Sequence, residues 1–294
     1  MYAVLLTALG ACGSTGGLNG SGPRVIRPAL ETEPVRTSGD AADDIAIWVH
    51  PTDPARSRFV ATDKRRGLVV YDLDGAIVQE VDSDGVNNVD IVRGFPVGGS
   101  AVDLAVGSAR TGNSIAVYRI DASTGWIDDA AARVITVDGG SVYGLCAGQG
   151  FESGAFYVFV TTTDDEIHQY RLFARGERVD AELVRRFNVG GHAEGMVVDP
   201  RQNALFVAEE DVGIWRYEAE PEWILRGKAE RHPELSSSEA GKRALIAMVG
   251  EDDLAADIEG LAIYPKGAGG YLLAASQGNS VFVVFDRAAP HSHV

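Results

Sequence analysis

The chain has 294 residues, 45% of them hydrophobic, which is enough apolar material for a large buried core. Its formal net charge of −16 argues against nucleic-acid binding, because proteins that grip a phosphate backbone concentrate positive charge. An acidic protein can still bind a polyanion where a bound cation reverses the local sign.

The N-terminus predicts export. Residues 4–12 are apolar and end in Leu9-Gly10-Ala11-Cys12, which resembles a bacterial lipobox, although no basic residue precedes them. We expect residues 1–12 to be a lipoprotein-type signal segment and the Gly/Ser-rich residues 13–23 to be a flexible tether. The protein would then be anchored at the cell envelope through Cys12, or secreted if the segment is a plain signal.

Five similar segments recur along the rest of the chain. They lie roughly 45 to 65 residues apart, as in propeller-type arrays. The segments are Asp43–Pro51, Asn88–Val92, Tyr143–Cys146, Glu194–Pro200 and Glu259–Pro265. Each opens with polar or tyrosyl residues and continues as a short apolar strand, so we interpret each as the start of one β-propeller blade.

The blades follow a repeated pattern of short strands. In the first unit, residues 45–49, 59–62 and 67–73 are β-branched and aromatic runs separated by Pro, Asp and Gly. No regular alternation with helices occurs, which argues against a βαβ fold and predicts an all-β propeller. The one helix we predict spans residues 236–249, with serines before it and Gly250 after it.

Residues 24–294 therefore form one predicted propeller domain with five recognisable blades. Propellers have four to eight blades and close by joining the last blade to the first. Two interpretations stay open: a closed ring of five blades, or a ring that lacks a blade.

The chemistry that remains is rich in carboxylates. Glycine-elbow, zinc-protease and phosphate-loop motifs are absent. If the opening strands line a central channel, acidic side chains converge there, and such oxygen clusters suit calcium. The candidates are Asp43, Asp44, Asp90, Glu194, Glu209, Glu210, Asp211, Asp257 and Glu259. A solvated loop is the alternative explanation for Glu209–Asp211.

Basic residues follow the second strands of the first two units. Lys64 and Arg65 follow the first of these strands, and Arg110 follows the second. On the rim above a calcium cluster they could bind phosphate oxygens, Arg in bidentate fashion.

Several ordered motifs together resemble the β-propeller phytases, calcium-dependent hydrolases of inositol hexakisphosphate. The motifs are Asp40–Trp48, Asn87–Ile91, Val142–Gly144, Glu194–Met196, Ala208–Asp211, Asp257–Leu261 and Gly270–Ser280. They cover roughly residues 40 to 287, so the resemblance concerns the whole predicted domain and implies a six-bladed fold of which about five blades are present.

The resemblance implies specific roles. The calcium ligands would be Asp43, Glu194, Glu210, Glu259 and Tyr143. The substrate phosphates would be bound by Lys64, Arg110 and Tyr143, and catalysis would depend on Tyr143, Glu210, Lys64 and Arg110. The implied reaction is hydrolysis of calcium phytate by metal-activated water with several calcium ions bound, carried out by a monomer that contacts a membrane only through its lipid anchor.

The chain departs from the family pattern at three points. Thr163 stands where the family has a phosphate-contacting lysine, and Ile45 stands where a proline is common. The family also continues into a sixth blade that supplies further calcium ligands.

Two other functions stay open. A non-catalytic, calcium-stabilised propeller could bind a ligand on its rim, or a propeller lactonase could use a channel calcium. Lys64 and Arg110 argue against the lactonase, because a lactone has no phosphate charge to bind.

Overall fold

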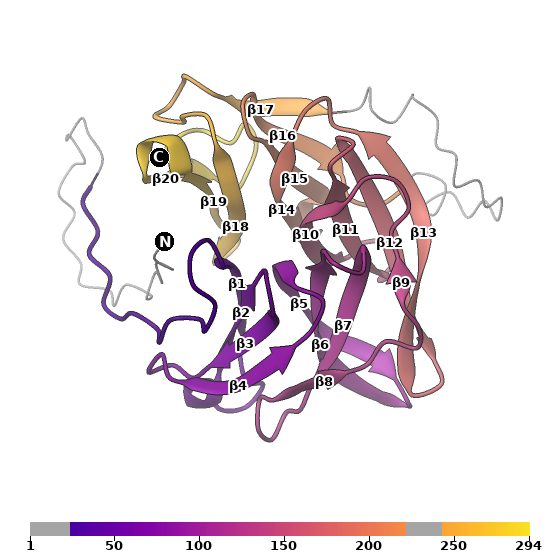
Figure 1. The fold of residues 1–294 in the computed structure, drawn as a ribbon. Helices are drawn as coiled ribbons and strands as arrows, with labels where there is room; N and C mark the ends of the chain where they lie inside the picture. The colour runs from indigo at the N-terminus through magenta and orange to yellow at the C-terminus, as the bar shows by residue number, and fades with distance from the viewer. Residues whose placement is uncertain (1–23, 222–242) are drawn as a thin grey trace.

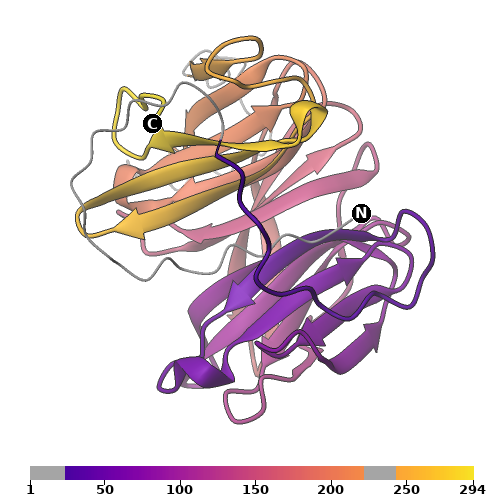
Figure 2. The same cartoon turned by 90° about the vertical axis from the view of Figure 1, so that its left-hand side faces the viewer.

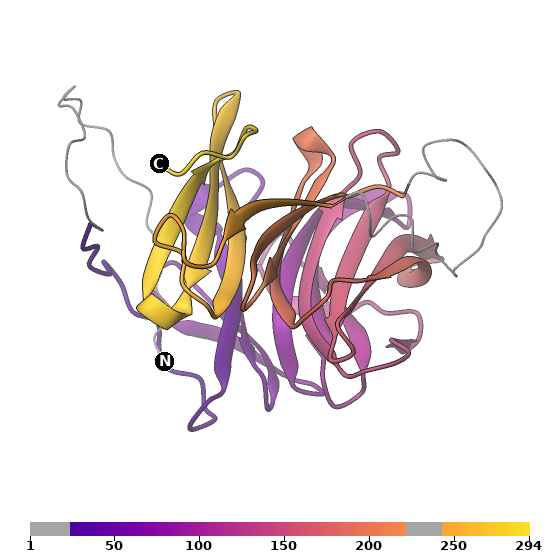
Figure 3. The same ribbon diagram turned by 90° about the horizontal axis from the view of Figure 1, so that it is seen from above.

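The computed structural model describes residues 24–221 and 243–294, which fold into five antiparallel sheets arranged around a central axis (Figure 1). Views from the side and from above show the sheets stacked face to face like blades (Figures 2 and 3). The predicted all-β propeller is thus confirmed.

Four blades have at least four strands each and the fifth has three. Blade 1 contains β1 (Ala42–Trp48), β2 (Arg58–Asp63), β3 (Gly67–Tyr71) and β4 (Ile77–Asp82). Blade 2 contains β5 (Val86–Val97), β6 (Ser100–Ala109), β7 (Ser114–Ile120), β8 (Ile127–Asp129) and β9 (Ile135–Thr136). Blade 3 contains β10 (Val142–Gln149), β11 (Phe156–Thr162), β12 (Glu166–Arg175) and β13 (Arg178–Asn188). Blade 4 contains β14 (Ala193–Asp199), β15 (Ala204–Glu209), β16 (Gly213–Glu218) and β17 (Ala244–Met248). Blade 5 contains β18 (Ile258–Lys266), β19 (Gly269–Ser276) and β20 (Val281–Asp286).

Helical structure in the described ranges is limited to three short 3₁₀ turns. They are η1 (Pro54–Arg56), η2 (Pro200–Gln202) and η4 (Gln277–Asn279). The predicted helix over residues 236–249 is wrong in its second half, because Ala244–Met248 forms β17 and pairs antiparallel with β16. Its first half lies outside the described residues, as do the predicted signal segment and tether.

None of the helices described is both long enough and apolar enough to cross a membrane.

The hydrophobic core lies between neighbouring blades. Separate clusters of buried side chains fill the spaces between blades 1 and 2, 2 and 3, 3 and 4, and 4 and 5. Period-two alternation along each strand sends apolar side chains to both faces of a blade, so each blade packs against two neighbours.

Blades 5 and 1 share no such cluster among the described residues. The inner strands β1, β5, β10, β14 and β18 pack in sequence, but β18 does not pack in the same way against β1. Ile47 on β1 is accordingly 49% exposed and Tyr264 on β18 is 47% exposed. Within residues 24–221 and 243–294 the ring is therefore open between blades 5 and 1.

Every inner strand carries a β-bulge at the same place. The register with the second strand shifts between residues 42 and 45, 86 and 89, 142 and 145, 193 and 196, and 258 and 261. In blades 1 to 3 a hydroxyl on the second strand accepts a hydrogen bond from the bulged backbone: Thr62 from Asp44, Ser108 from Asn88 and Thr161 from Gly144. Bulges redirect side chains, and here they recur at one end of the channel.

Candidate active site

Two positions in each blade build the site. The first is the bulge on the inner strand, and the second is the residue directly after the second strand. The backbone N–H of that second residue donates a 2.9 Å hydrogen bond to the carbonyl oxygen two residues before the bulge in all five blades: Lys64 to Ala41, Arg110 to Gly85, Thr163 to Ser141, Glu210 to His192 and Gln277 to Asp257. This repeated bond holds the two side chains side by side on the channel rim.

The bulge positions carry mostly acidic or amide side chains. In blade order they are Asp43, Asn87, Tyr143, Glu194 and Glu259, and the partner positions are Lys64, Arg110, Thr163, Glu210 and Gln277. Positive charge thus lies on blades 1 and 2, whereas blades 4 and 5 contribute carboxylates.

A cavity of about 470 Å³ opens among these residues. It is lined by Gly39, Asp40, Asp43, Lys64, Asn87, Tyr143, Glu194, Glu259 and Gln277. Seven of these nine occupy the two repeated positions, so the cavity is a product of the blade repeat.

Lys64 is held by two carboxylates. Its ammonium Nζ lies 2.9 Å from Asp43 Oδ1 and 3.0 Å from Asp40 Oδ1. Burial lowers the pKa of Lys64, but the hydrogen bonds to Asp43 and Asp40 outweigh it, so the pKa is raised overall. The lysine is therefore a fixed cation at the cavity wall.

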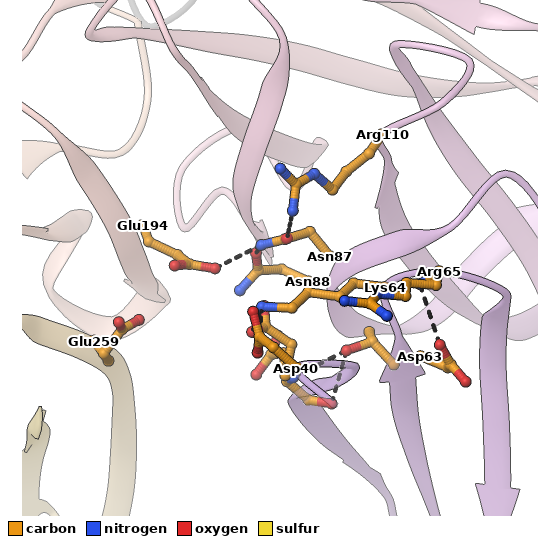
Figure 4. Close-up of polar contacts among 12 residues, drawn as sticks. Asp40, Asp63, Lys64, Arg65, Asn87, Asn88, Arg110, Glu194 and Glu259 are labelled. Atoms are coloured by element: carbon orange, nitrogen blue, oxygen red, sulfur yellow. Dashed lines mark hydrogen bonds and ion pairs between the residues drawn. The ribbon is translucent and has the colours of Figure 1, made fainter. Parts of the chain in front are cut away.

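Asn87 connects the cationic and anionic parts of the rim (Figure 4). Its side-chain Nδ2 donates to Glu194 Oε1 at 2.6 Å, and its Oδ1 accepts from Arg110 Nη1 at 3.1 Å. Arg110 therefore reaches the site through Asn87, and its remaining guanidinium N–H groups are suited to oxyanions.

The carboxylates repel one another. Burial, followed by the charges of Asp43 and Glu259, raises the pKa of Glu194 to about 8. Burial is also the largest cause of the raised pKa values of Glu210 and Glu259. Tyr143 lies beside Glu194, and its pKa is raised by burial and by the surrounding carboxylates.

The three acidic residues Glu209–Asp211 have different surroundings. Glu209 is buried and accepts a hydrogen bond from Trp215 Nε1 at 2.6 Å, so it supports the blade. Glu210 is on the rim, and its buried Oε1 has no hydrogen-bond partner within the described structure. Asp211 is exposed. Only Glu210 is thus available for a ligand.

The oxygen donors fit calcium chemically. Across residues 24–221 and 243–294 no three His, Cys, Asp or Glu side chains are drawn together into a ready-made metal site. The unpartnered Oε1 of Glu210 and the carboxylates of Glu194 and Glu259 nevertheless provide hard oxygen ligands.

The structure brings most predicted site residues together. Asp43, Lys64, Tyr143, Glu194 and Glu259 line one cavity. Arg110 contacts the lining residue Asn87, whereas Glu210 occupies the equivalent rim position of blade 4 without lining the cavity itself.

Two predicted carboxylates lie elsewhere. Asp44 Oδ2 accepts from the backbone N–H of Val89 at 2.9 Å, and Asp90 Oδ2 accepts from that of Ala147 at 2.8 Å. Each therefore fastens its blade to the next one.

Sequence reasoning missed Asn87, Gln277 and His192. Gln277 donates to Glu259 Oε1 at 2.7 Å. The ring of His192 lies 4.5 Å from that of Tyr143, centroid to centroid. The signal that could have identified Asn87 and Gln277 is positional, since both fall where the other blades carry charged rim residues.

Fold and cavity together define a β-propeller with an acidic central site bordered by two cations. A phytase family profile matches residues 19–294. The chain is also 37% identical over 271 residues to the 3-phytase of Bacillus subtilis (strain 168), covering 90% of this chain and 66% of that protein. The chain belongs to the phytase family.

Solved structures confirm the propeller fold alone. A protein from Lactobacillus plantarum aligns with a TM-score of 0.54 at 13% identity, covering 90% of this chain and 72% of the other. Sqt1 from Chaetomium thermophilum aligns with a TM-score of 0.52 at 13% identity, covering 86% and 70%.

Proposed function

We propose that the protein is a calcium-dependent phosphomonoesterase that releases phosphate from phytate. The supporting observation is the rim itself: cations on blades 1 and 2 face carboxylates on blades 4 and 5 across one cavity. A site with only cationic side chains could bind any anion, and a site with only carboxylates could bind any hard metal cation. A rim that combines cationic side chains with carboxylates is suited to a phosphate ester bound together with metal cations.

Different residues of the site would bind the phosphate and the metal cation. Arg110 and Lys64 would bind phosphate oxygens, with Arg110 oriented by Asn87. Tyr143, beside Glu194 on the cavity wall, would contact both the phosphate and a cation. This placement orients one phosphate over the acidic side of the cavity, which lowers the entropic part of the barrier.

Calcium would be held by Asp43, Glu194, Glu210, Glu259 and Tyr143. When bound, calcium offsets phosphate charge and lowers the pKa of water. Without a cation, burial and the neighbouring carboxylates raise the pKa values of Glu194, Glu210 and Glu259, so a bound cation would favour their charged forms.

The test is phosphate release from phytate by the full chain, with calcium and with a chelator. We expect calcium-dependent release that falls at least roughly a hundredfold in Glu210→Gln, because a neutral amide replaces the anionic carboxylate that would bind calcium. Asp211→Asn removes the same charge from the exposed neighbouring acid and should leave the rate unchanged.

A folded chain that binds calcium but releases no phosphate would overturn this proposal. That outcome would support a calcium-stabilised binding module instead.

A further inference from the structure

His192 occupies a repeated rim position, but its side chain has no counterpart in the other blades. Its carbonyl oxygen makes the repeated hydrogen bond with Glu210 N, as do Ala41, Gly85, Ser141 and Asp257 in their own blades. His192 is the only ring-bearing side chain among these five. What its imidazole touches is therefore specific to blade 4.

The imidazole lies between two proposed site residues. Its ring packs on the Tyr143 ring of blade 3 with an interplanar angle of 32°. Its Nε2 lies 3.8 Å from the Glu210 Oε1 that has no hydrogen-bond partner. The residue thus bridges blades 3 and 4 at the cavity.

The Tyr143 backbone is fixed, but its ring needs a lateral support. The Tyr143 carbonyl accepts from Ser108 Oγ at 2.7 Å, and the next residue donates to Thr161 Oγ1 at 2.7 Å. These bonds leave the two side-chain torsions of Tyr143 free. The Tyr143 hydroxyl lies close enough to Glu194 for that carboxylate to raise its pKa, and the His192 ring packs against the Tyr143 ring.

We propose that His192 is a positioning residue whose ring holds the Tyr143 phenol against Glu194. The inference rests on the proposed phosphatase function for its kinetic consequence. The geometry of the ring pair supports it separately.

The kinetic test compares three variants of the full chain acting on phytate with calcium. His192→Ala should lower kcat roughly tenfold, since small misplacement of a site group is costly, with a smaller effect on KM. His192→Phe keeps a flat ring and should stay within about twofold of the wild type, whereas His192→Gln keeps an N–H donor and should resemble the alanine variant. An unchanged alanine variant, or rescue by Gln but not by Phe, would overturn the proposal.

A double-mutant cycle separates positioning from a general structural effect. In a Tyr143→Phe background there is no hydroxyl to orient, so adding His192→Ala should change kcat less than about twofold. Additive losses would contradict the proposal. Circular dichroism and unfolding midpoints establish that each variant is folded.

NMR spectroscopy tests the ring contact without an activity measurement, so the proposal for His192 can be tested separately from the proposed phosphatase function. The Tyr143 ring signals can be assigned among the nine tyrosines by their loss in Tyr143→Phe. We expect these NMR shifts to move in His192→Ala and to remain ring-shifted in His192→Phe. Tyr143 signals that do not move would contradict the proposed ring contact, even if the enzyme is active. A wild-type chain that shows the expected shifts but is inactive on phytate would contradict only the proposed phosphatase function.

Discussion

Carboxylates of one chemical type serve two purposes in this protein, and their hydrogen bonds decide which. Glu194 and Glu259 face the cavity and meet amide donors from Asn87 and Gln277. Asp90 instead accepts from the backbone N–H groups of Ile91 and Ala147, at 2.7 and 2.8 Å. A backbone-bound carboxylate between two blades contributes to stability rather than to ligand binding.

Asp90 makes stability depend on pH. Burial, with a smaller contribution from Asp44, raises its pKa to about 6 from a usual value of 3.8. The folded protein therefore binds this proton more tightly than the unfolded chain, so stability is highest below the usual value and falls as pH rises through about 6.

We expect Asp90→Asn to remove this dependence. The difference in unfolding free energy, variant minus wild type, should grow with pH across the window from about 4 to 6 by on the order of 2 kcal/mol. Urea unfolding at several pH values in a chelator measures it, and Asp128→Asn on an exposed part of β8 is the matched control. A difference that is constant with pH would contradict the assignment.

At the scale of the element, the inner strands approach one another through small residues in the bulges. A Cβ built on Gly144 would lie 2.1 Å from the Glu194 carbonyl oxygen of the next blade. One built on Gly195 would lie 1.8 Å from the Glu259 carbonyl oxygen. The equivalent Gly260 has no atom within 4 Å, as expected next to the open side of the ring.

Two alanine substitutions at equivalent positions should therefore differ. Gly195→Ala forces the backbones of blades 4 and 5 apart and should lower the free energy of unfolding by about 1–3 kcal/mol. Gly260→Ala meets open space and should be close to neutral. Paired urea titrations measure both, and equal losses would mean that the bulge, rather than the contact between blades, requires glycine.

For the whole molecule, the open side of the ring gives the blades unequal support. In the described part of the chain, blade 3 shares core clusters with both neighbours, whereas blade 5 shares one only with blade 4. Regions with fewer buried contacts open more readily.

Amide hydrogen exchange should reveal this gradient. We expect the backbone amides of β18 to β20 to exchange faster than those of β10 to β12, because blade 5 can separate without disturbing two interfaces. Peptide-resolved mass spectrometry in the absence of ligand is the measurement. Equal protection in the two blades would show that the described part of the ring unfolds as one unit.

The sequence predicts this fold well and the site in part. Repeats that begin at Asp43, Glu194 and Glu259 mark the blades, because each inner strand needs the same bulge and the same apolar alternation. The predicted helix was wrong over Ala244–Met248. This segment contains good helix formers, but its pairing with β16 outweighs that local preference.

Neutral site residues were not predictable in the same way. Asn87 and Gln277 carry no charge that marks a metal or phosphate site, and His192 stands outside the repeated motif. Only their position in the blade repeat marks Asn87 and Gln277, and the contact of His192 with Tyr143 is between side chains of different blades, which a single sequence does not display.

The repeated bond between the bulge and the residue after the second strand has an evolutionary consequence. Each blade delivers its two side chains from the same backbone frame, so a mutation at either position changes one sector of the rim and leaves strand pairing intact. Thr163 shows this on blade 3, where a hydroxyl stands at the position that holds a cation in blades 1 and 2. A ligand preference built this way can be altered one blade at a time, while selection on the packing between blades continues unchanged.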